Sequence, residues 1–214
     1  MEGPICPADT QLIETFAWLG GRFRRLDYHL ARLYRSAEAL GFALDQGAIA
    51  DALDQINGPK PLRIRLTLGL DGAVGITSAT LAPNPAEWRI SVAPDRLNSA
   101  DPFLQHKTTQ RRLYDQTRAA LPAGVDEVIF LNERDEVCEG TITNLFFDLG
   151  RGLSTPPLTS GCLPGVLRAE RLASGTCTEA VLMAKDLPRA RLWMGNSLRG
   201  LIPARLVQSV SRLT

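Results

Sequence analysis

Apolar residues near the start of the chain follow first a strand pattern and then a helix pattern. Residues 12–18 are mostly apolar and predict a strand that ends at a turn formed by Gly20 and Gly21. From residue 26 to residue 40, apolar positions recur every three or four residues. That spacing predicts an amphipathic helix, and Gly41 is expected to end it.

The next part of the chain predicts a second helix and a β-hairpin. Asp45 is a suitable N-cap for a helix that runs to about residue 56, where an Asn-Gly-Pro sequence breaks the pattern. Residues 62–70 then alternate apolar and polar positions, and an Asp-Gly pair turns the chain into residues 73–80. Two antiparallel strands are therefore expected.

The second half of the chain mixes strands and helices without a strict βαβ repeat, which favours the α+β class. Strands are expected near residues 88–93, 127–131, 145–148, 180–183, 192–194 and 204–207, and helices near residues 110–120 and 166–173. The polar segment between Pro94 and Pro102 predicts a linker between two lobes. We place a small N-terminal α/β lobe at residues 1–95, the linker at 96–103 and a larger C-terminal lobe at 104–214.

Composition narrows the class of partner. The chain has 214 residues, of which 44% are hydrophobic and 22% charged, so it can bury a core large enough for one domain or two small ones. Its net charge of +1 argues against nucleic acid or a membrane surface as the main partner, because those partners normally require a clustered basic excess. Small molecules or other protein chains are expected instead.

Cysteine usage and the N-terminus favour the cytoplasm. Four cysteines are scattered without a CxxC pair, so neither a metal site nor a disulfide framework is indicated. The start of the chain, Met1–Pro4, lacks a basic region followed by an apolar run. No apolar stretch approaches the roughly 18 residues of a spanning helix. Secretion and membrane insertion are therefore not expected.

One carboxylate carries the strongest chemical signal. Glu139 lies between two apolar runs and is followed by Gly140 and Asn144. A carboxylate beside a glycine, which permits close approach, can hold a protonated heterocyclic nitrogen or a cationic side chain. Upstream lies Lys107, one of only three lysines in the chain. A lysine can form an imine with a carbonyl when its surroundings keep part of its amine neutral.

Taken together, the motifs resemble the class IV aminotransferase family, the fold-type IV enzymes that depend on pyridoxal 5'-phosphate (PLP). The resemblance covers nearly the whole chain and is carried by Glu14-Thr15, the run from Leu26 to Leu33, His106 to Arg111, Glu139 to Phe146 and Gly195 to Pro203. It implies two α/β lobes of the D-amino acid aminotransferase type with the cofactor between them. A homodimer and a small amino-bearing carboxylate as substrate are also implied.

The resemblance assigns roles to individual residues. Lys107, in the C-terminal lobe, resembles the Schiff-base lysine, Glu139 the partner of the pyridine nitrogen and Arg32 the phosphate-binding arginine. His29, one turn before Arg32, is interpreted as structural. The remaining implied cofactor ligands are a phosphate loop with Leu163, Gly165, Val166 and Leu167, together with Asn144 and Ser197. No metal is implied.

Each role has a simpler structural alternative. Lys107 could be a solvated surface lysine, Glu139 a strand-end carboxylate in an ion pair, and Arg32 an exposed helix arginine. Ser197 could be a turn serine. The context of Glu139 and the scarcity of lysines favour the chemical reading.

Within the family, the sequence around Lys107 and Asn196 most resembles the 4-amino-4-deoxychorismate lyases, which release 4-aminobenzoate and pyruvate on the way to folate. In such an enzyme the freed Lys107 would remove the proton at C4 of the substrate. The substrate has two carboxylates, and the candidate ligands are Thr15, Arg111, Tyr114 and Arg199, with Arg63, Arg65, Arg89 and Arg112 left open.

Two alternatives remain at this stage. The Thr155-Pro-Pro sequence and the Leu-Pro-Gly sequence also resemble branched-chain aminotransferases, so a branched-chain or D-amino acid aminotransferase is the nearest alternative. An inactive protein that keeps the fold as a binding or assembly subunit is the alternative from another class.

Overall fold

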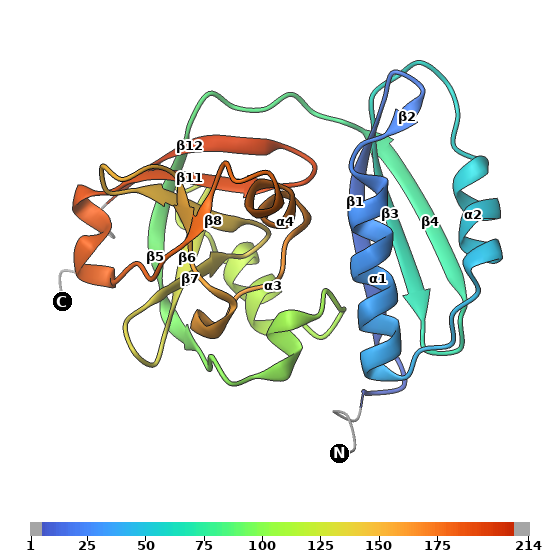
Figure 1. Cartoon of the computed structure of the whole chain (residues 1–214), viewed down its shortest axis with the longest axis horizontal. Helices are drawn as coiled ribbons and strands as arrows, with labels where there is room; N and C mark the ends of the chain where they lie inside the picture. Colours follow the sequence, from blue (N-terminus) through green and yellow to red (C-terminus); the bar gives the residue numbers. More distant parts are fainter. Residues whose placement is uncertain (1–5, 208–214) are drawn as a thin grey trace. The chain divides into compact units, whose positions relative to one another are not determined.

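The structure, a computed structural model, describes residues 6–207 and divides the chain into two compact units. Unit 1 comprises the residues up to Pro83 together with His106–Gln110, and unit 2 comprises Asn84–Gln105 and the residues from Arg111 onward. Each unit has its own sheet and its own helices (Figure 1). This mixture confirms the predicted α+β class.

Unit 1 is an antiparallel sheet in the order β2-β1-β3-β4 that packs against helices. Its elements are β1 (Gln11–Leu19), β2 (Arg22–Phe23), α1 (Leu26–Leu40), α2 (Gln46–Asp54), β3 (Leu62–Gly69) and β4 (Val74–Thr80). Alternate strand residues such as Phe16 and Ile64 share one sheet face and pack with Leu33 and Ala37 of α1. The resulting core explains why the predicted strand and helix periodicities were both correct here.

The ends of the two helices also follow the sequence signals. Gly41 adopts a left-handed φ of 72°, and its N–H donates to the carbonyl of Ala37, which ends α1. The Asp45 side chain accepts hydrogen bonds from the N–H groups of Gly47 and Ala48, which caps α2. Both predicted helix ends are confirmed.

Unit 2 is built on a sheet that closes on itself. Its strands are β5 (Trp88–Leu97), β6 (Glu127–Asn132), β7 (Val137–Gly140), β8 (Asn144–Asp148), β9 (Ser154–Thr155), β10 (Thr178–Glu179), β11 (Arg191–Asn196) and β12 (Gly200–Leu206). The order is β10-β9-β8-β11-β12-β5-β6-β7, and β7 also pairs with β8. Within the described residues, β5, β6, β7, β8, β11 and β12 therefore form a closed ring, from which β9 and β10 branch.

Alternating side chains fill this ring and attach the helices to its outside. Ile129 and Leu145 pack in a cluster to which all strands of the ring contribute. Phe130, the next residue of β6, packs with residues of α3 (Arg112–Ala119), and Phe146 of β8 packs with Leu167 of α4 (Val166–Ala173). Short 3-10 helices, η1 (Pro102–Gln105), η2 (Leu158–Ser160) and η3 (Ala184–Arg189), complete unit 2.

The predicted linker is where the structure differs most from expectation. Residues 96–103 are not a linker, because β5 continues through Leu97 and η1 begins at Pro102. Pro94 lies inside β5, between Val92 and Arg96, where the register of pairing with β6 shifts. A proline is tolerated at such an irregularity because no ladder hydrogen bond depends on its missing N–H.

The division into lobes differs for a related reason. Asn84–Gln105 groups with unit 2 and not with the N-terminal residues, whereas His106–Gln110 returns to unit 1 through backbone pairing with β1. Lys107 therefore belongs structurally to unit 1, although we expected it in the C-terminal lobe. Such pairing between distant residues leaves no local pattern in the sequence.

A smaller correction concerns the strand expected at residues 180–183. These residues form no named strand, but Leu182 accepts a backbone hydrogen bond from Val137, and Met183 forms an isolated bridge with Glu136. Between residues 6 and 207, no helix combines the length and the apolar character needed to cross a bilayer. The expectation about Met1–Pro4 lies outside the described residues.

Candidate active site

The segment that carries Lys107 is fixed to β1 by backbone hydrogen bonds. The N–H of Ile13 donates to the Lys107 carbonyl at 2.7 Å, and the N–H of Thr109 donates to the Gln11 carbonyl at 2.9 Å. The Gln11 N–H in turn donates to the Thr109 hydroxyl at 2.9 Å. His106 contacts Ser36 of α1, with Nδ1 and Oγ 3.0 Å apart. The backbone position of Lys107 is thus set by contacts that do not involve its side chain.

In the same unit, a buried ionic cluster connects β1 with α1. It is formed by Glu14 of β1 and by His29 and Arg32 of α1. Arg32 donates to Glu14 through two nitrogens, Nε to Oε1 at 2.8 Å and Nη2 to Oε2 at 2.6 Å. His29 Nδ1 lies 2.5 Å from Oε2. None of the three side chains is more than 6% exposed. The alternative that Arg32 is an exposed helix arginine is therefore wrong.

The Glu14 carboxyl occupies a position that would otherwise hold an apolar residue. Glu14 pairs with Leu66 and shares a sheet face with Leu12 and Phe16, which belong to the core. Burial raises the pKa of Glu14, but the charge of Arg32 and the hydrogen bonds from His29 and Arg32 outweigh it and bring the pKa to about 2. Burial lowers the pKa of His29 despite the hydrogen bond to Glu14. The cluster is thus built around a stable carboxylate.

These shifts predict a loss of stability in acid. The ordinary pKa of the Glu14 carboxyl is 4.5 and the folded value is about 2, so below pH 4.5 the unfolded chain takes up a proton that the folded chain does not. The stabilisation is complete above pH 4.5 and is lost as the pH falls toward 2. The lowered pKa of His29 acts in the same direction below pH 6.5. We expect urea titrations to show that the free energy of unfolding falls by roughly 3 kcal/mol between pH 5 and pH 2 through the titration of Glu14 alone.

The control for this prediction is an exposed carboxyl. Glu14→Gln should flatten the dependence of the unfolding free energy between pH 5 and pH 2, in addition to lowering stability at neutral pH. Glu38→Gln, at an exposed position on α1, should keep the slope of the parent protein. Equal slopes in the parent and Glu14→Gln would show that Glu14 is not the titrating group.

The opposite face of β1 carries a different set of polar residues. Thr15 pairs with Arg65 of β3, and the neighbouring Ala17 pairs with Arg63. Both arginines are exposed, whereas Thr15 is half-buried. Of the arginines that the sequence left open as substrate ligands, these two lie on the same sheet face as Thr15.

In unit 2, Glu139 is buried at the end of β7 and receives three described hydrogen bonds. The Tyr114 hydroxyl donates to Oε1 at 2.8 Å, while the Leu163 N–H and Asn144 Nδ2 approach Oε2 at 3.0 Å and 3.3 Å. Only 6% of Glu139 is exposed. These three donors come from α3, β8 and the segment before α4.

Asn144 joins Glu139 to the predicted phosphate loop. It is the register partner of Glu139, and its Nδ2 also donates to the Leu163 carbonyl at 2.9 Å. The loop passes so close to Asn144 that a Cβ on Gly165 would lie 1.8 Å from Asn144 Oδ1. Only glycine leaves room for this contact, which explains the glycine in the Leu-Pro-Gly sequence.

The start of α4 follows this contact. Gly165 is the residue before the helix, and no described side chain caps the N–H groups of the first turn. Uncapped N–H groups and the positive end of the helix dipole suit an anion. Val166 and Leu167 are buried, and Leu167 packs where a side chain on Gly195 would clash. Ser197, two residues after Gly195, is also buried.

The sequence did not identify a second buried carboxylate, Glu127, which contacts the turn between β7 and β8. Glu127, at the start of β6, is fully buried. It accepts hydrogen bonds from the Thr141 N–H at 3.1 Å, the Thr141 hydroxyl at 2.6 Å and the Thr143 hydroxyl at 3.3 Å. Gly140 lies over its carboxyl carbon. A glutamate opening an apolar strand, with a Thr-x-Thr turn downstream, was the available signal.

The remaining predicted ligands make contacts inside unit 2. Arg111 donates through Nη2 to the Thr141 carbonyl at 2.7 Å, and Arg199 and Asn84 bond each other. Between residues 6 and 207, no group of three His, Cys, Asp or Glu side chains is arranged to hold a metal ion.

With this geometry established, the chain can be compared with known proteins. The family model described as amino-transferase class IV matches residues 11–207. The chain belongs to the class IV aminotransferase family. The predicted family is therefore confirmed, and its members are PLP-dependent enzymes. This membership argues against an inactive binding or assembly subunit.

Three relatives illustrate the range of this class IV family. A Mesorhizobium loti protein, named as a candidate amino-acid aminotransferase, is 48% identical, with a TM-score of 0.87 over 93% of this chain and 100% of its own. The aminodeoxychorismate lyase of Bacillus subtilis is 26% identical over 94% of this chain and 78% of its own. The 4-amino-4-deoxychorismate lyase of Pseudomonas aeruginosa, at 24% identity and a TM-score of 0.77, covers 96% of this chain and 87% of its own and shares the fold.

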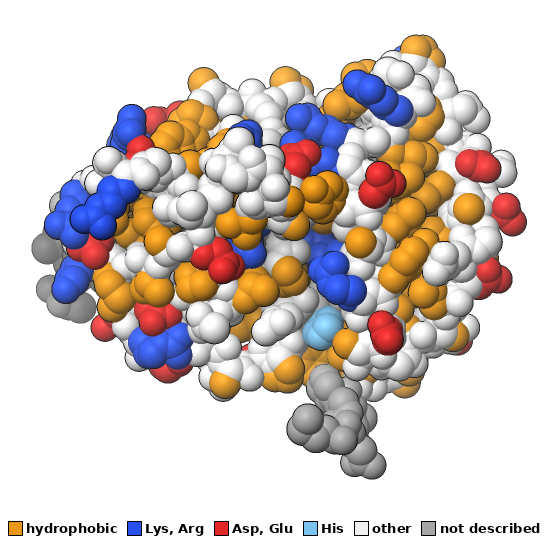
Figure 2. All heavy atoms as spheres, viewed as in Figure 1, with side chains coloured by type: hydrophobic (Ala, Val, Ile, Leu, Met, Phe, Trp, Pro, Cys, Tyr) orange, Lys and Arg blue, Asp and Glu red, His pale blue; other side chains and the backbone are white. Residues whose placement is uncertain are grey.

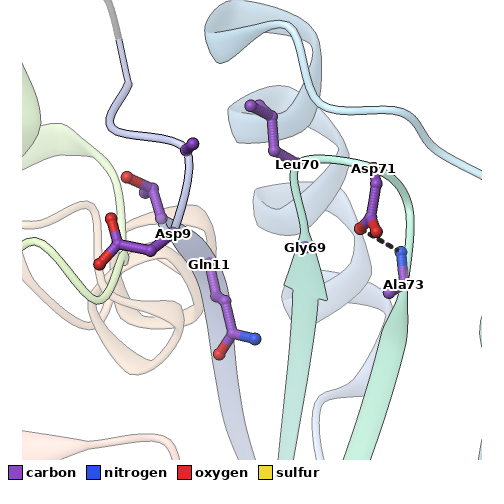
Figure 3. A pocket seen from close by; sticks show the side chains of 8 residues that line it. Asp9, Gln11, Gly69, Leu70, Asp71 and Ala73 are labelled. Atoms are coloured by element: carbon purple, nitrogen blue, oxygen red, sulfur yellow. Dashed lines mark hydrogen bonds between the residues drawn. The ribbon is translucent and has the colours of Figure 1, made fainter.

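A pocket of unit 1 lies apart from the residues assigned by the class IV resemblance. Figure 3 shows it between the start of β1 and the β3–β4 turn, where Asp71 accepts a hydrogen bond from the Ala73 N–H. Asp9, Gln11 and Leu70 also line it, and none of the predicted ligands does. On the face that Figure 2 shows, acidic and basic side chains are interspersed.

Proposed function

We propose that this chain binds PLP and acts as a 4-amino-4-deoxychorismate lyase, releasing 4-aminobenzoate and pyruvate. The observation that carries the proposal is the buried Glu139 carboxylate with its hydrogen-bond donors. A carboxylate fixed in this way can pair with a protonated ring nitrogen. The similarity to the Bacillus subtilis lyase over 94% of the chain supports the choice of reaction.

The described residues fit the chemistry of the cofactor. Glu139 would hold the pyridine nitrogen, and Asn144 would keep the carboxylate close to the loop before α4. The uncapped N–H groups after Gly165 would bind the phosphate, with Arg32 and Ser197 as further ligands. When bound, PLP supplies an electron sink for bond breaking at the amine-bearing carbon of the substrate.

Lys107 has two proposed tasks. Its Nζ would attach the cofactor and, once the substrate amine has taken its place, would remove the proton at C4 of the substrate. Glu139 would keep the ring nitrogen protonated during this step. Loss of the pyruvate unit from C3 then leaves an aromatic product, so the reaction needs no amino-group acceptor.

The substrate is a small molecule with two carboxylates, which require cationic or hydrogen-bonding ligands. Thr15, Arg111 and Arg199 remain proposed ligands from the resemblance. The sheet face with Thr15 adds the exposed Arg63 and Arg65, whose positive charges suit a carboxylate.

Amino transfer is the second candidate. The 48% identity to the Mesorhizobium loti protein, which is named as a candidate amino-acid aminotransferase, favours it. The same Lys107 and Glu139 would serve that reaction, because both reactions begin by removing a proton from the amine-bearing carbon.

A paired assay separates the two reactions. We expect purified protein loaded with PLP to release equal amounts of pyruvate and 4-aminobenzoate from 4-amino-4-deoxychorismate when no 2-oxo acid is added as an amino-group acceptor. The same preparation should form little glutamate from branched-chain or D-amino acids and 2-oxoglutarate. Rapid glutamate formation without pyruvate release would replace the lyase proposal with the aminotransferase, and a protein that cannot be loaded with PLP would contradict both.

We also propose a cytoplasmic homodimer, as the resemblance implies. Light scattering of the PLP-loaded protein should give twice the mass of one 23.3 kDa chain.

A further inference from the structure

One face of helix α3 is directed at the β7–β8 hairpin that carries Glu139. Arg111, Tyr114 and Arg118 are spaced three and four residues apart, so they lie on one face of α3. Arg111 is the N-cap residue directly before the helix, and the other two lie within it. Arg111 Nη2 donates to the Thr141 carbonyl at 2.7 Å, and Arg118 Nη1 donates to the Thr141 hydroxyl at 3.1 Å. The two arginines hold the turn of the hairpin. Tyr114, between them, reaches Glu139 itself.

The ring of Tyr114 is held on two sides. It packs edge-on against Phe130 of β6, with ring centroids 5.1 Å apart, and the Arg111 guanidinium lies 5.4 Å over its face. Arg111 is itself tied to Asp115 by a 2.7 Å ion pair. The direction of the Tyr114 hydroxyl is therefore set by packing before any ligand is considered.

The hydroxyl meets one specific oxygen of Glu139. It donates to Oε1 at 2.8 Å, whereas the Leu163 N–H and Asn144 Nδ2 both contact Oε2. Hydrogen bonds to both oxygens hold the plane of a carboxylate more firmly than hydrogen bonds to one oxygen do, because each added contact opposes rotation about the bond to the carboxyl carbon. Burial and the neighbouring Glu139 charge raise the pKa of Tyr114, so the phenol keeps its proton and remains a donor.

We infer that Tyr114 is a positioning residue for Glu139: its hydroxyl sets the plane of the carboxylate that would hold the ring nitrogen of the cofactor. This assignment replaces the role of substrate ligand that the resemblance suggested for Tyr114. It rests on the proposed function for the identity of the cofactor, but the Tyr114–Glu139 contact exists without it.

The test compares Tyr114→Phe, which removes the hydroxyl and keeps the ring packing, with Tyr28→Phe at an exposed position on α1. In the PLP-loaded enzyme we expect Tyr114→Phe to shift the absorption band of the bound cofactor and to weaken PLP binding by roughly 3–10-fold. The kcat should fall by a similar factor, with KM for the substrate unchanged within about twofold. Tyr28→Phe should match the parent protein.

A second measurement keeps this inference separate from the proposed function. In cofactor-free protein labelled with 13C-glutamate, the Glu139 carboxyl resonance is assigned by its loss in Glu139→Gln. We expect Tyr114→Phe to move that resonance and Tyr28→Phe to leave it in place. An unmoved resonance overturns the inference, as does a raised KM with an unchanged absorption band, which would make Tyr114 a substrate ligand. If the parent protein binds no PLP, the proposed function fails while the resonance still decides the role of Tyr114.

Discussion

Replacing Lys107 with alanine is expected to lower pyruvate release by about 10³-fold or more. The substitution removes the amine that would attach the cofactor and the base that would take the C4 proton, and a positioned base alone contributes roughly 10²–10⁴-fold. The backbone of the segment should stay in place, because its hydrogen bonds to Gln11 and Ile13 do not use the lysine side chain. Initial rates of pyruvate and 4-aminobenzoate release measure the effect.

Two further lysines provide the controls. Lys60 and Lys185 are exposed, and alanine at either position should leave both the rate and the cofactor absorption band unchanged. Added methylamine should restore part of the activity of Lys107→Ala, since it can supply a base where the side chain is missing. A Lys107→Ala protein with the parent rate would remove Lys107 from the mechanism.

Local patterns predicted the elements whose formation depends on neighbours in sequence. The helix at residues 26–40 was predicted with its ends because apolar spacing and Gly41 are both local signals. The hairpin of β3 and β4 was predicted for the same reason. Pro94, in contrast, looked like a strand breaker, and only the pairing with distant β6 shows why a strand can continue through it.

In the candidate site, too, the residues in local sequence motifs could be predicted, whereas their partners from distant parts of the chain could not. Lys107 and Glu139 stand in recognisable local motifs, so the sequence could propose a chemistry for them. The partners that orient these residues come from far along the chain: Tyr114 reaches Glu139 from 25 residues away and Arg32 reaches Glu14 from 18. Their spacing shows which face of a helix they occupy, but it does not show what that face contacts.

The buried acids illustrate this limit most clearly. Glu14 and Glu127 each open or interrupt an apolar strand pattern, and sequence alone would place such a residue on the exposed face of the strand. The structure buries both, because each is surrounded by donors: Arg32 and His29 around Glu14, and the Thr141 turn around Glu127. A buried carboxylate is stable only when its partners are present, and those partners are set by the fold.

Replacing Glu139 with glutamine should lower the rate of pyruvate release by roughly 10²–10³-fold, an effect second only to the loss of Lys107. Glutamine has nearly the same shape, and its single oxygen can still accept a hydrogen bond from either Tyr114 or the Leu163 N–H, which donate to different oxygens of Glu139, so the fold and PLP binding should survive. It carries no negative charge, however, and would no longer keep the ring nitrogen protonated, which leaves a weaker electron sink.

The signature of this effect is a rate loss without loss of the cofactor. In Glu139→Gln we expect a changed cofactor absorption band and a kcat that falls much more than the affinity for PLP. Glu87→Gln, which alters an exposed carboxylate paired with Arg205, is the matched control and should behave like the parent protein. If Glu139→Gln kept the parent kcat while binding PLP normally, the carboxylate would not be the partner of the ring nitrogen, and its burial with Tyr114, Asn144 and Leu163 would then be a structural feature of the hairpin.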